Sequence, residues 1–524
     1  PQWIQIKFLS GAVISSRAFC EKRKVVISLV EPAIEYILKC IFENVSESEA
    51  DMMCKEIGLR MNSENQTDCP RCFSVVLHHL IKELPCSVIR INALNFLRLV
   101  QITDDDYFDQ CLNFRLLGCR ISESKLQIQD KELFVDFVME IIEKCEDLYK
   151  YIKVVDALLE IIFQYGQDRP LIVILDGLWK RAGGNVTDSE SENLQVILIK
   201  LLAYVKSFSR VCDLGNFFEL FDLLQDAHQT ALSMHLIEII SRELCDLESG
   251  KVRLAFKYCQ LLYDGASNLR LNHDDCQNLV RLISRVIHMV RYGAHNNLHL
   301  LFLIDCREAF GSMSEVKENL VHSCNHLAVK SLTNRDRKRA FVKSCMTFNE
   351  VTIPSINGRI KQLHLYIETA QVALLCGLSG MVDGLISSAL GCLEFPDSAI
   401  ERSTVVVLEK EKDELLSAVQ KLCSFLVIVP GDINEGATKF PKAILSLVNS
   451  STWMPFTLKI KILCALLKLL ATLPQNNLPY HPSYFHTLCN DTLFYGCSSY
   501  VDDLVSLSGN VLQVLLTLME SEQT

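Results

Sequence analysis

The sequence predicts an all-α fold, a HEAT-like α-solenoid made of antiparallel helix pairs. Apolar residues recur at steps of three and four along most of the 524 residues, which is the period of a helix with one buried face. Only 13 prolines and 21 glycines occur, too few for the frequent turns of an all-β fold. Helix-length patterns follow one another through short polar links, without an exact repeat length. We therefore expect residues 1–524 to form a single elongated solenoid, with a soft division near 183–192.

The clearest helix pair is expected between residues 131 and 163. Its first helix covers Lys131–Cys145, where an apolar stripe lies opposite acids such as Asp136. Its second helix covers Leu148–Phe163, and Gly166 is a plausible stop. The same pattern predicts helices over 26–42, 51–61, 193–208, 216–226, 229–247, 252–263, 272–290, 411–428, 440–448, 458–473 and 502–519.

Three short β-branched runs could be read as strands. They cover residues 171–175, 404–408 and 426–429. Each run is isolated, lacks a partner with a hairpin signal, and fits inside a helix-length apolar pattern. We expect helix in all three.

Net charge and cysteine content restrict the partners and the compartment. The net charge of −11 argues against nucleic acid as the main partner, because phosphate binding needs a concentrated basic face. Many of the 22 cysteines, such as Cys145 and Cys464, stand at apolar positions of helical patterns. They are interpreted as reduced, buried residues of a cytoplasmic protein. Because the first residue is Pro1, we expect the chain to be the C-terminal portion of a longer one.

One weakly charged window, Val372–Leu393, has the length of a membrane span. Gly377, Ser379 and Gly380 predict a turn inside it, and a charge such as Asp383 within a span would cost about 2.5–3.5 kcal/mol. We therefore expect two short helices in this window and no transmembrane segment.

Cys69-Pro-Arg-Cys72 is the sharpest local motif in the chain. A C-x-x-C pair can hold zinc or exchange thiols, and His78 or His79 could supply a third zinc ligand. The second half of a usual zinc site is missing nearby, where only Cys54 and Cys86 are candidates. Ordinary cysteines at the start of a helix explain the pair more simply. No metal site is therefore predicted, and zinc remains an alternative.

Other catalytic patterns fail at a required residue. The apolar run before Asp176 resembles a magnesium-binding strand of nucleotide hydrolases, but the chain has no phosphate loop. His288, His295 and His299 would share one helix face if Gly293 did not interrupt the helix. We predict no catalytic, cofactor-binding or metal-binding residue, and the partner-binding residues stay unknown. A helical-repeat protein without such chemistry is expected to act as a scaffold.

The segment from 328 to 474 carries a family resemblance. Phe341-Val-Lys-Ser-Cys345, Thr352-Ile-Pro-Ser355 and Gln371-Val-Ala-Leu374 are similar to the large subunits of endosomal sorting complexes, and Phe425-Leu-Val-Ile-Val-Pro430 resembles the next solenoid helix of that family. The step at Thr352–Ser355 is shared in style with the large subunit of retromer. The fuller resemblance is to the vacuolar protein sorting-associated protein 35-like family, the large scaffold subunit of the retriever complex.

This resemblance implies a non-enzymatic scaffold for recycling membrane cargo from endosomes to the plasma membrane. Its C-terminal half would bind a small phosphoesterase-fold subunit, and an arrestin-like subunit would bind nearer the N-terminus. COMM-domain and coiled-coil-domain proteins would be further partners. The protein would be cytoplasmic and would associate with endosomes peripherally, through other proteins. The alternative is a helical-repeat adaptor or transport-receptor-like scaffold that binds peptides or other proteins along its concave face.

The turn inside this segment also has a physical interpretation. Thr352 is expected to cap the following helix and Pro354 to lie in its first turn. The basic residues between Arg335 and Lys343 precede it in an otherwise acidic chain. They are interpreted as a solvated helix face or as a docking patch for an acidic partner or an anionic membrane.

Overall fold

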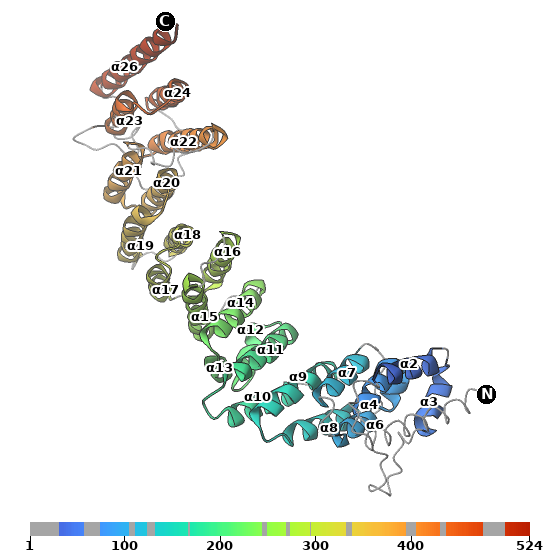
Figure 1. Ribbon diagram of the computed structural model, residues 1–524. Helices are drawn as coiled ribbons and strands as arrows, with labels where there is room; N and C mark the ends of the chain where they lie inside the picture. The colour runs from blue at the N-terminus through green and yellow to red at the C-terminus, as the bar shows by residue number, and fades with distance from the viewer. Residues whose placement is uncertain are drawn as a thin grey trace. The chain divides into compact units, whose positions relative to one another are not determined.

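The all-α prediction is confirmed. The computed structural model describes residues 31–43, 45–56, 74–103, 110–122, 131–165, 168–243, 249–268, 273–293, 295–331, 338–394, 405–429, 436, 438–474 and 498–523. These residues form helices and no β-strand, in the manner of an α-solenoid (Figure 1). The antiparallel pairing of the helices and the soft division near 183–192 stay predictions.

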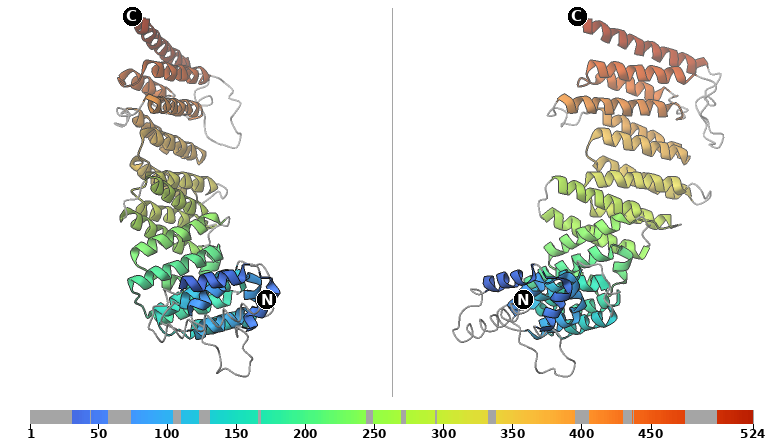
Figure 2. Two further views of the ribbon diagram at one scale, coloured as in Figure 1. Left: turned by 45° about the vertical axis from the view of Figure 1, so that its right-hand side comes forward. Right: turned by 90° about the vertical axis from the view of Figure 1, so that its right-hand side faces the viewer.

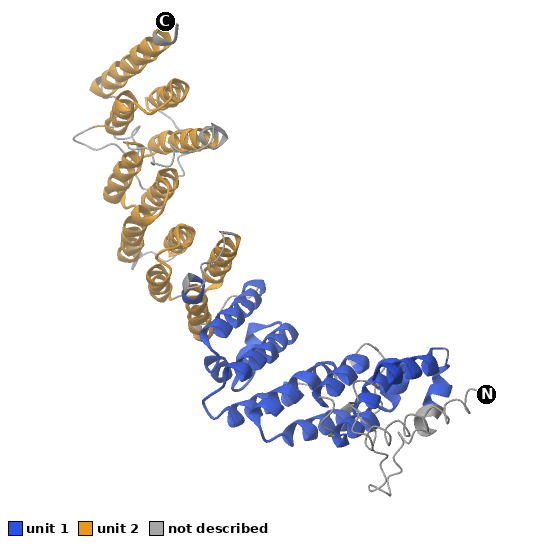
Figure 3. Cartoon of the chain, viewed as in Figure 1, with its two compact units in different colours: residues 1–243, 264–269 blue, residues 244–263, 270–524 orange. Residues whose placement is uncertain are grey.

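The chain divides into two compact units, shown in blue and orange in Figure 3. Unit 1 comprises residues 1–243 and 264–269, and unit 2 comprises residues 244–263 and 270–524. Helix α15 (Ser249–Asn268) contributes residues to both units.

Unit 1 is a stack in which helices contact others one to three places along the chain. One row runs through α2, α4, α7, α9, α11 and α14, each packed on the next, and a second includes α6 on α8 and α10 on α13. The bounds are α2 Glu31–Phe42, α3 Glu47–Glu56, α4 Ser74–Glu83, α5 Cys86–Ile91, α6 Ala93–Ile102, α7 Gln110–Ser122, α8 Lys131–Glu143, α9 Leu148–Tyr165, α10 Asp168–Ala182, α11 Asp188–Val205, α12 Phe208–Asp213, α13 Phe217–Asp222 and α14 Asp226–Arg242.

Unit 2 shows the two-row arrangement more clearly. Helices α16, α18, α20, α22, α24 and α26 each pack on the next, while α17 packs on α19 and α21 on α23. They appear as successive rungs in Figure 2, from yellow to red. The bounds are α16 His273–Met289, α17 Asn296–Ala309, α18 Ser314–Lys330, α19 Lys338–Thr352, α20 Arg359–Leu375, α21 Ser379–Glu394, α22 Val405–Leu426, α23 Lys439–Ser450, α24 Phe456–Thr472 and α26 Ser498–Gln523, with a 3₁₀ turn η3 over Ile353–Ser355.

The turn that opens α20 differs from the sequence prediction. Thr352 ends α19 instead of capping α20, because its hydroxyl is buried and donates to the Phe348 carbonyl at 2.6 Å. Pro354 lies in the separate turn η3, and α20 begins at Arg359 after Gly358, whose φ is 96°. The capping interpretation of Thr352 is therefore wrong. Thr352 keeps helical backbone angles, with φ −84° and ψ −44°, its side chain makes no capping hydrogen bond, and α20 begins seven residues later.

Two other helix boundaries differ from the prediction, and the local sequence explains both. The helix expected from 193 begins at Asp188, because Thr187 and Glu190 form a reciprocal capping box with a Thr187 N–H to Glu190 carboxylate distance of 2.9 Å. The run 426–429 is a helix only at Leu426, where α22 ends, so the expectation of helix there is wrong. Pro430 explains the stop, since a proline disfavours helical geometry in the residue before it.

The other helix expectations for short runs and for the apolar window are confirmed. Residues 171–175 lie within α10 and residues 405–408 within α22. The window 372–393 is split between α20 and α21 at Gly377, whose φ of 70° suits a residue without a side chain.

Candidate protein-interaction surface

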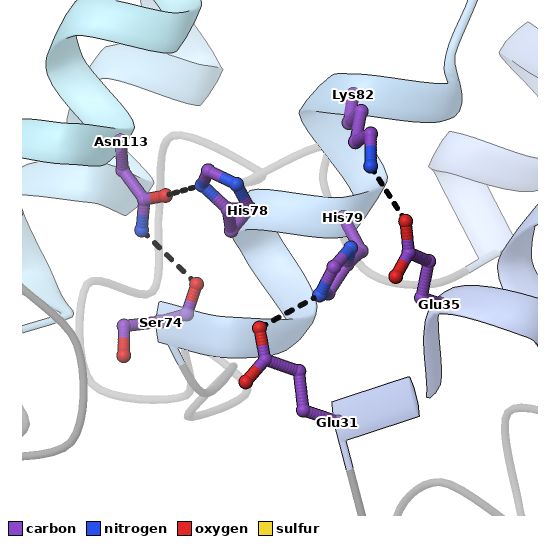
Figure 4. A network of polar contacts seen from close by, with 7 residues as sticks. All are labelled: Glu31, Glu35, Ser74, His78, His79, Lys82 and Asn113. Carbon is purple, nitrogen blue, oxygen red and sulfur yellow. Dashed lines mark hydrogen bonds and ion pairs between the residues drawn. The ribbon is translucent and has the colours of Figure 1, made fainter. Parts of the chain in front are cut away.

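The residues proposed for a zinc site are only partly described. Cys69 and Cys72 lie outside the described residues, and so does the side chain of Cys54. His78 and His79 lie on α4, and each ring contacts a different helix (Figure 4). His78 Nδ1 lies 3.0 Å from the Asn113 amide oxygen on α7, and burial lowers the pKa of His78.

His79 Nε2 lies 3.4 Å from the Glu31 carboxylate on α2. Both rings therefore connect α4 to neighbouring helices. Within the described ranges, no group of three or more His, Cys, Asp or Glu side chains is placed to hold a metal ion. The zinc alternative stays a prediction that depends on Cys69 and Cys72.

The remaining candidate residues are Asp176 and the three histidines His288, His295 and His299. Asp176 lies on α10 and accepts a hydrogen bond of 2.5 Å from the Asn216 amide, next to α13. His288 lies in the last turn of α16, and His295 and His299 lie at the start of α17. The three histidines therefore do not share one helix face, and Gly293, with a φ of 58°, lies in the interruption between the two helices.

The last described helix, α26, has a conventional buried face. Tyr500, Leu504, Leu507, Val511 and Leu515 are spaced by three or four residues and are all buried. This stripe faces α24, on which α26 packs, and Tyr500 also donates a hydrogen bond to the Leu473 carbonyl at 3.2 Å. We call these five residues the inner stripe. Burying one such leucine contributes about 1.5–3 kcal/mol, so the inner stripe accounts for the position of α26.

A second apolar stripe lies on the exposed side of α26. Its members are Val501, Val505, Leu512, Leu516 and Met519, with exposed fractions of 47%, 65%, 51%, 61% and 54%. We call these five residues the outer stripe. Its ends lie 18 residues apart, or about 27 Å along the helix. An exposed apolar surface of this kind is a candidate interaction site.

A groove of about 700 Å³ lies between α23 and α26, on a different side of α26 from the outer stripe. Lys442 and Asn449 line it from α23, and Asp503, Ser506 and Asn510 line it from α26. These groups can donate and accept hydrogen bonds, but none of them belongs to the outer stripe. The helix over 502–519 was predicted from the sequence, but its two apolar faces were not. The spacing of its apolar residues, which fall into two stripes, could have indicated them.

The composition of α26 also raises the question of a membrane. In the part of the chain that the structure describes, residues 499–520 form one helix long and apolar enough to cross a bilayer, by length and composition alone. About a fifth of that window, 22%, is buried within the protein. The same test is passed by core helices, and one face of α26 packs on α24.

Comparison with known sequences identifies the family. Residues 59–523 match the family described as the VPS35L C-terminal domain. The chain belongs to the VPS35L C-terminal domain family. Proteins named VPS35 endosomal protein-sorting factor-like are 24% identical over 522 residues in Danio rerio and 24% over 517 in Mus musculus. A Dictyostelium discoideum protein of the corresponding name is 21% identical over 501 residues.

These matches cover 94–95% of this chain but only 49–52% of the relatives. The chain therefore spans about half the length of the curated relatives it matches. The resemblance to the VPS35-like family drawn from 328–474 is confirmed, and it extends over most of this VPS35L C-terminal domain.

Within this VPS35L C-terminal domain, the family-like segment contains a polar cluster that joins α18, α19 and α20. Asn325 donates to Glu368 at 2.8 Å, and Asn349 donates to the Asn325 amide oxygen at 2.7 Å. His322 Nδ1 lies 2.8 Å from the other Glu368 oxygen. The hydrogen bond with Glu368 raises the pKa of His322. Burial raises the pKa of Glu368, but hydrogen bonds from His322 and Asn325 outweigh it, so the net pKa is lowered.

The His322–Glu368 pair should make a small, pH-dependent contribution to stability. The raised pKa of His322 means that its contribution is fully present below pH 6.5 and is lost as the pH rises through the folded-state value. The lowered pKa of Glu368 means that its contribution is present above pH 4.5 and is lost as the pH falls. The pair therefore stabilises most between these values. Because the side chains are 43% and 36% exposed, we expect at most about 1 kcal/mol.

Urea denaturation of wild type and His322→Gln at pH 5.5 and 8.5 measures this contribution. The variant should be less stable at pH 5.5, and the difference should shrink at pH 8.5. A difference of equal size at both pH values would mean that His322 contributes through packing and not through its charge.

Proposed function

We propose that this chain is part of a non-enzymatic scaffold of a retriever-like complex, which recycles membrane cargo from endosomes to the plasma membrane. Relatives over nearly the whole chain are named as endosomal protein-sorting factors, which supports a role in endosomal protein sorting. The all-helical, two-row architecture supports a binding role, because stacked helices offer long surfaces for other proteins.

The C-terminal half would bind a small phosphoesterase-fold subunit, the partner implied by the family resemblance. The observation that carries this part is the outer stripe of α26, a row of exposed apolar side chains about 27 Å long. A stable interface needs roughly 800 Å² on each partner, with an apolar centre and a polar rim. The outer stripe would supply the apolar centre.

Further partners would be an arrestin-like subunit and COMM-domain and coiled-coil-domain proteins. The chain would reach the endosome through these proteins, so its membrane association would be peripheral. The apolar length of α26 would then reflect one face packed on α24 and one face that binds a partner.

Copurification with the small phosphoesterase-fold subunit tests the proposal. We expect one-to-one recovery with wild type and a loss of at least tenfold in affinity with Leu512→Glu/Leu516→Glu, because two charges would be buried at the apolar centre of the interface. Leu298→Glu/Leu301→Glu on α17 is the matched control, since these leucines are also exposed, at 49% and 54%. The control should bind normally.

The possible outcomes separate the parts of the proposal. Loss of recovery after truncation from Lys410 onward, but normal recovery with the outer-stripe variant, would place the docking site elsewhere in the C-terminal half. Failure of wild type to recover the small subunit, with transport receptors or diverse peptides bound instead, would favour the adaptor alternative. Circular dichroism should be unchanged in both charge variants because all four positions are exposed.

A further inference from the structure

Histidines gather where α16, α17 and α18 meet. His288 lies in the last turn of α16, His299 in the first turn of α17, and His326 on α18. We call these three residues the histidine cluster. Both α16 and α17 pack on α18, and His288 Nδ1 lies 3.4 Å from the Ser323 hydroxyl of α18. The turn between α16 and α17 is therefore held against α18 (Figure 1).

Aromatic packing holds the His299 ring in a half-buried position. Its centroid lies 5.9 Å from that of Tyr292 in the turn, and Tyr292 lies 6.2 Å from Phe302 on α17. An aromatic ring can stabilise a cation above its face, but these two rings are tilted by 51° at nearly the limiting distance. A charged imidazole would lose water here without a compensating partner, so the packing favours the neutral ring.

The charged groups around the histidine cluster are basic. Arg291, at the end of α16, and Lys330 and His326, on α18, act on His299. Arg291 is fixed by a hydrogen bond of 3.0 Å to the His288 carbonyl. The same arginine and two histidines of α18 act on His288. Among the described residues, no carboxylate acts on the pKa of either histidine, and α19, which also packs on α17, supplies no charged group to them.

The acids of this region act on a different histidine. Glu368 on α20 lies 2.8 Å from His322 on α18. Glu318 also acts on His322, although it forms an ion pair with Lys361 at 3.1 Å. The hydrogen bond with Glu368 is the main reason that the pKa of His322 is raised. One side of α18 therefore contacts histidines without acids, and the other side carries a histidine with one.

These two kinds of histidine respond to acid in opposite directions. Burial, with the neighbouring cations, lowers the pKa of His299 to about 4, and it also lowers that of His288. In the unfolded chain both rings take up protons near pH 6.5, so the folded state loses stability as the pH falls from 6.5 toward the folded-state pKa. The contribution of His322 is instead fully present below pH 6.5.

We propose that the turn between α16 and α17 is an acid-sensitive joint, which is held against α18 at neutral pH and released when His288 and His299 become protonated. The new charges repel each other and the neighbouring cations, and they recover water when the turn opens. The bond between His322 and Glu368 strengthens under the same conditions. Acidification therefore loosens the turn while α20 stays packed on α18.

Hydrogen exchange of the full chain at pH 7.5 and 5.5, corrected for the intrinsic exchange rate at each pH, tests the proposal. Protection in the last turn of α16 and the first turn of α17 should fall by up to about tenfold at pH 5.5. This is the factor for one histidine that takes up its proton near pH 6.5 only when the turn is open. Protection of α20 should not fall.

Two variants assign the response to its groups. His299→Phe keeps a ring beside Tyr292 but cannot take up a proton, so it should retain most of its protection at pH 5.5. Lys330 is exposed, so Lys330→Gln removes a cation near His299 without opening a cavity, and its loss of protection should be smaller than that of wild type. His235→Gln on α14 is the matched control, because it removes an exposed histidine of unit 1, and it should behave as wild type.

Three results would overturn the proposal. Equal protection of the turn at both pH values would mean that acid does not release it. A loss at pH 5.5 that is unchanged in both His299→Phe and Lys330→Gln would assign the response to other groups. An equal loss in α20 and in the turn would show general unfolding by acid instead of a local joint.

Discussion

Gly177→Ala should destabilise unit 1 by about 2 kcal/mol, although alanine is the better helix former. A methyl group at this position of α10 would overlap the Tyr151 hydroxyl oxygen and would lie 2.9 Å from Cζ of the same ring. Overpacking of this kind costs about 1–3 kcal/mol, and a contact so short belongs at the upper end. The gain in helix propensity is about 1 kcal/mol and is the smaller effect.

Tyr151 cannot easily move away from the added methyl group. Its ring is 1% exposed, the Arg181 guanidinium lies 4.1 Å from the ring centroid, and its hydroxyl donates to the Ile174 carbonyl at 3.4 Å. Hydrogen exchange of α9 and α10 measures the loss of protection.

Two further variants isolate the cause. Tyr151→Phe should restore part of the stability of Gly177→Ala, because it removes the atom in closest contact. Gly391→Ala on α21 is the matched control, since nothing lies within 4 Å of its added Cβ, and it should stabilise unit 2 by up to about 1 kcal/mol. A Gly177→Ala protein as stable as wild type would contradict the packing around Tyr151.

Asn325→Ala should cost unit 2 about 2–3 kcal/mol. Asn325 is 2% exposed and links Glu368 on α20 to Asn349 on α19. Its removal leaves the buried Asn349 amide without its closest acceptor, at 2.7 Å, and takes from the Glu368 carboxylate one of its two partners, the other being His322. Unsatisfied groups of this kind cost about 1–3 kcal/mol, more when they are charged.

Urea denaturation of the single and double variants measures the coupling. Asn349→Ala should also destabilise, and the double variant should lose less than the sum, because both changes remove the same bond. Ser323→Ala is the control, since its contact with His288 is longer, at 3.4 Å, and exposed, and it should change stability by less than about 0.5 kcal/mol. Strict additivity would mean that the cluster does not act as a unit.

The fold class and most helices were predictable because apolar residues recur along the chain with the period of an α-helix. The pair at 131–163 appears as α8 and α9, and the split of 372–393 follows from the conformational freedom of Gly377. Helix ends were less predictable. Thr352 fits a cap by sequence, but its hydroxyl is buried and bonds within its own helix, which only packing decides.

The candidate interaction surfaces could not be predicted in the same way. The outer stripe needs knowledge of which face of α26 packs on α24, since both faces are apolar in sequence. The basic run at 335–343 suggested a patch, but Arg339 donates to the Gly377 carbonyl at 2.9 Å, at the end of α20. Arg335 and Arg337 lie outside the described residues.

The two-row packing of unit 2 has a mechanical consequence. A helix that contacts mainly its neighbours one and two places away can tilt slightly without breaking any distant contact. Small tilts add along the array and set its curvature. Unit 2 can therefore bend gradually along its length. A partner bound to one helix can then change the curvature of the surface to which another partner binds several helices away.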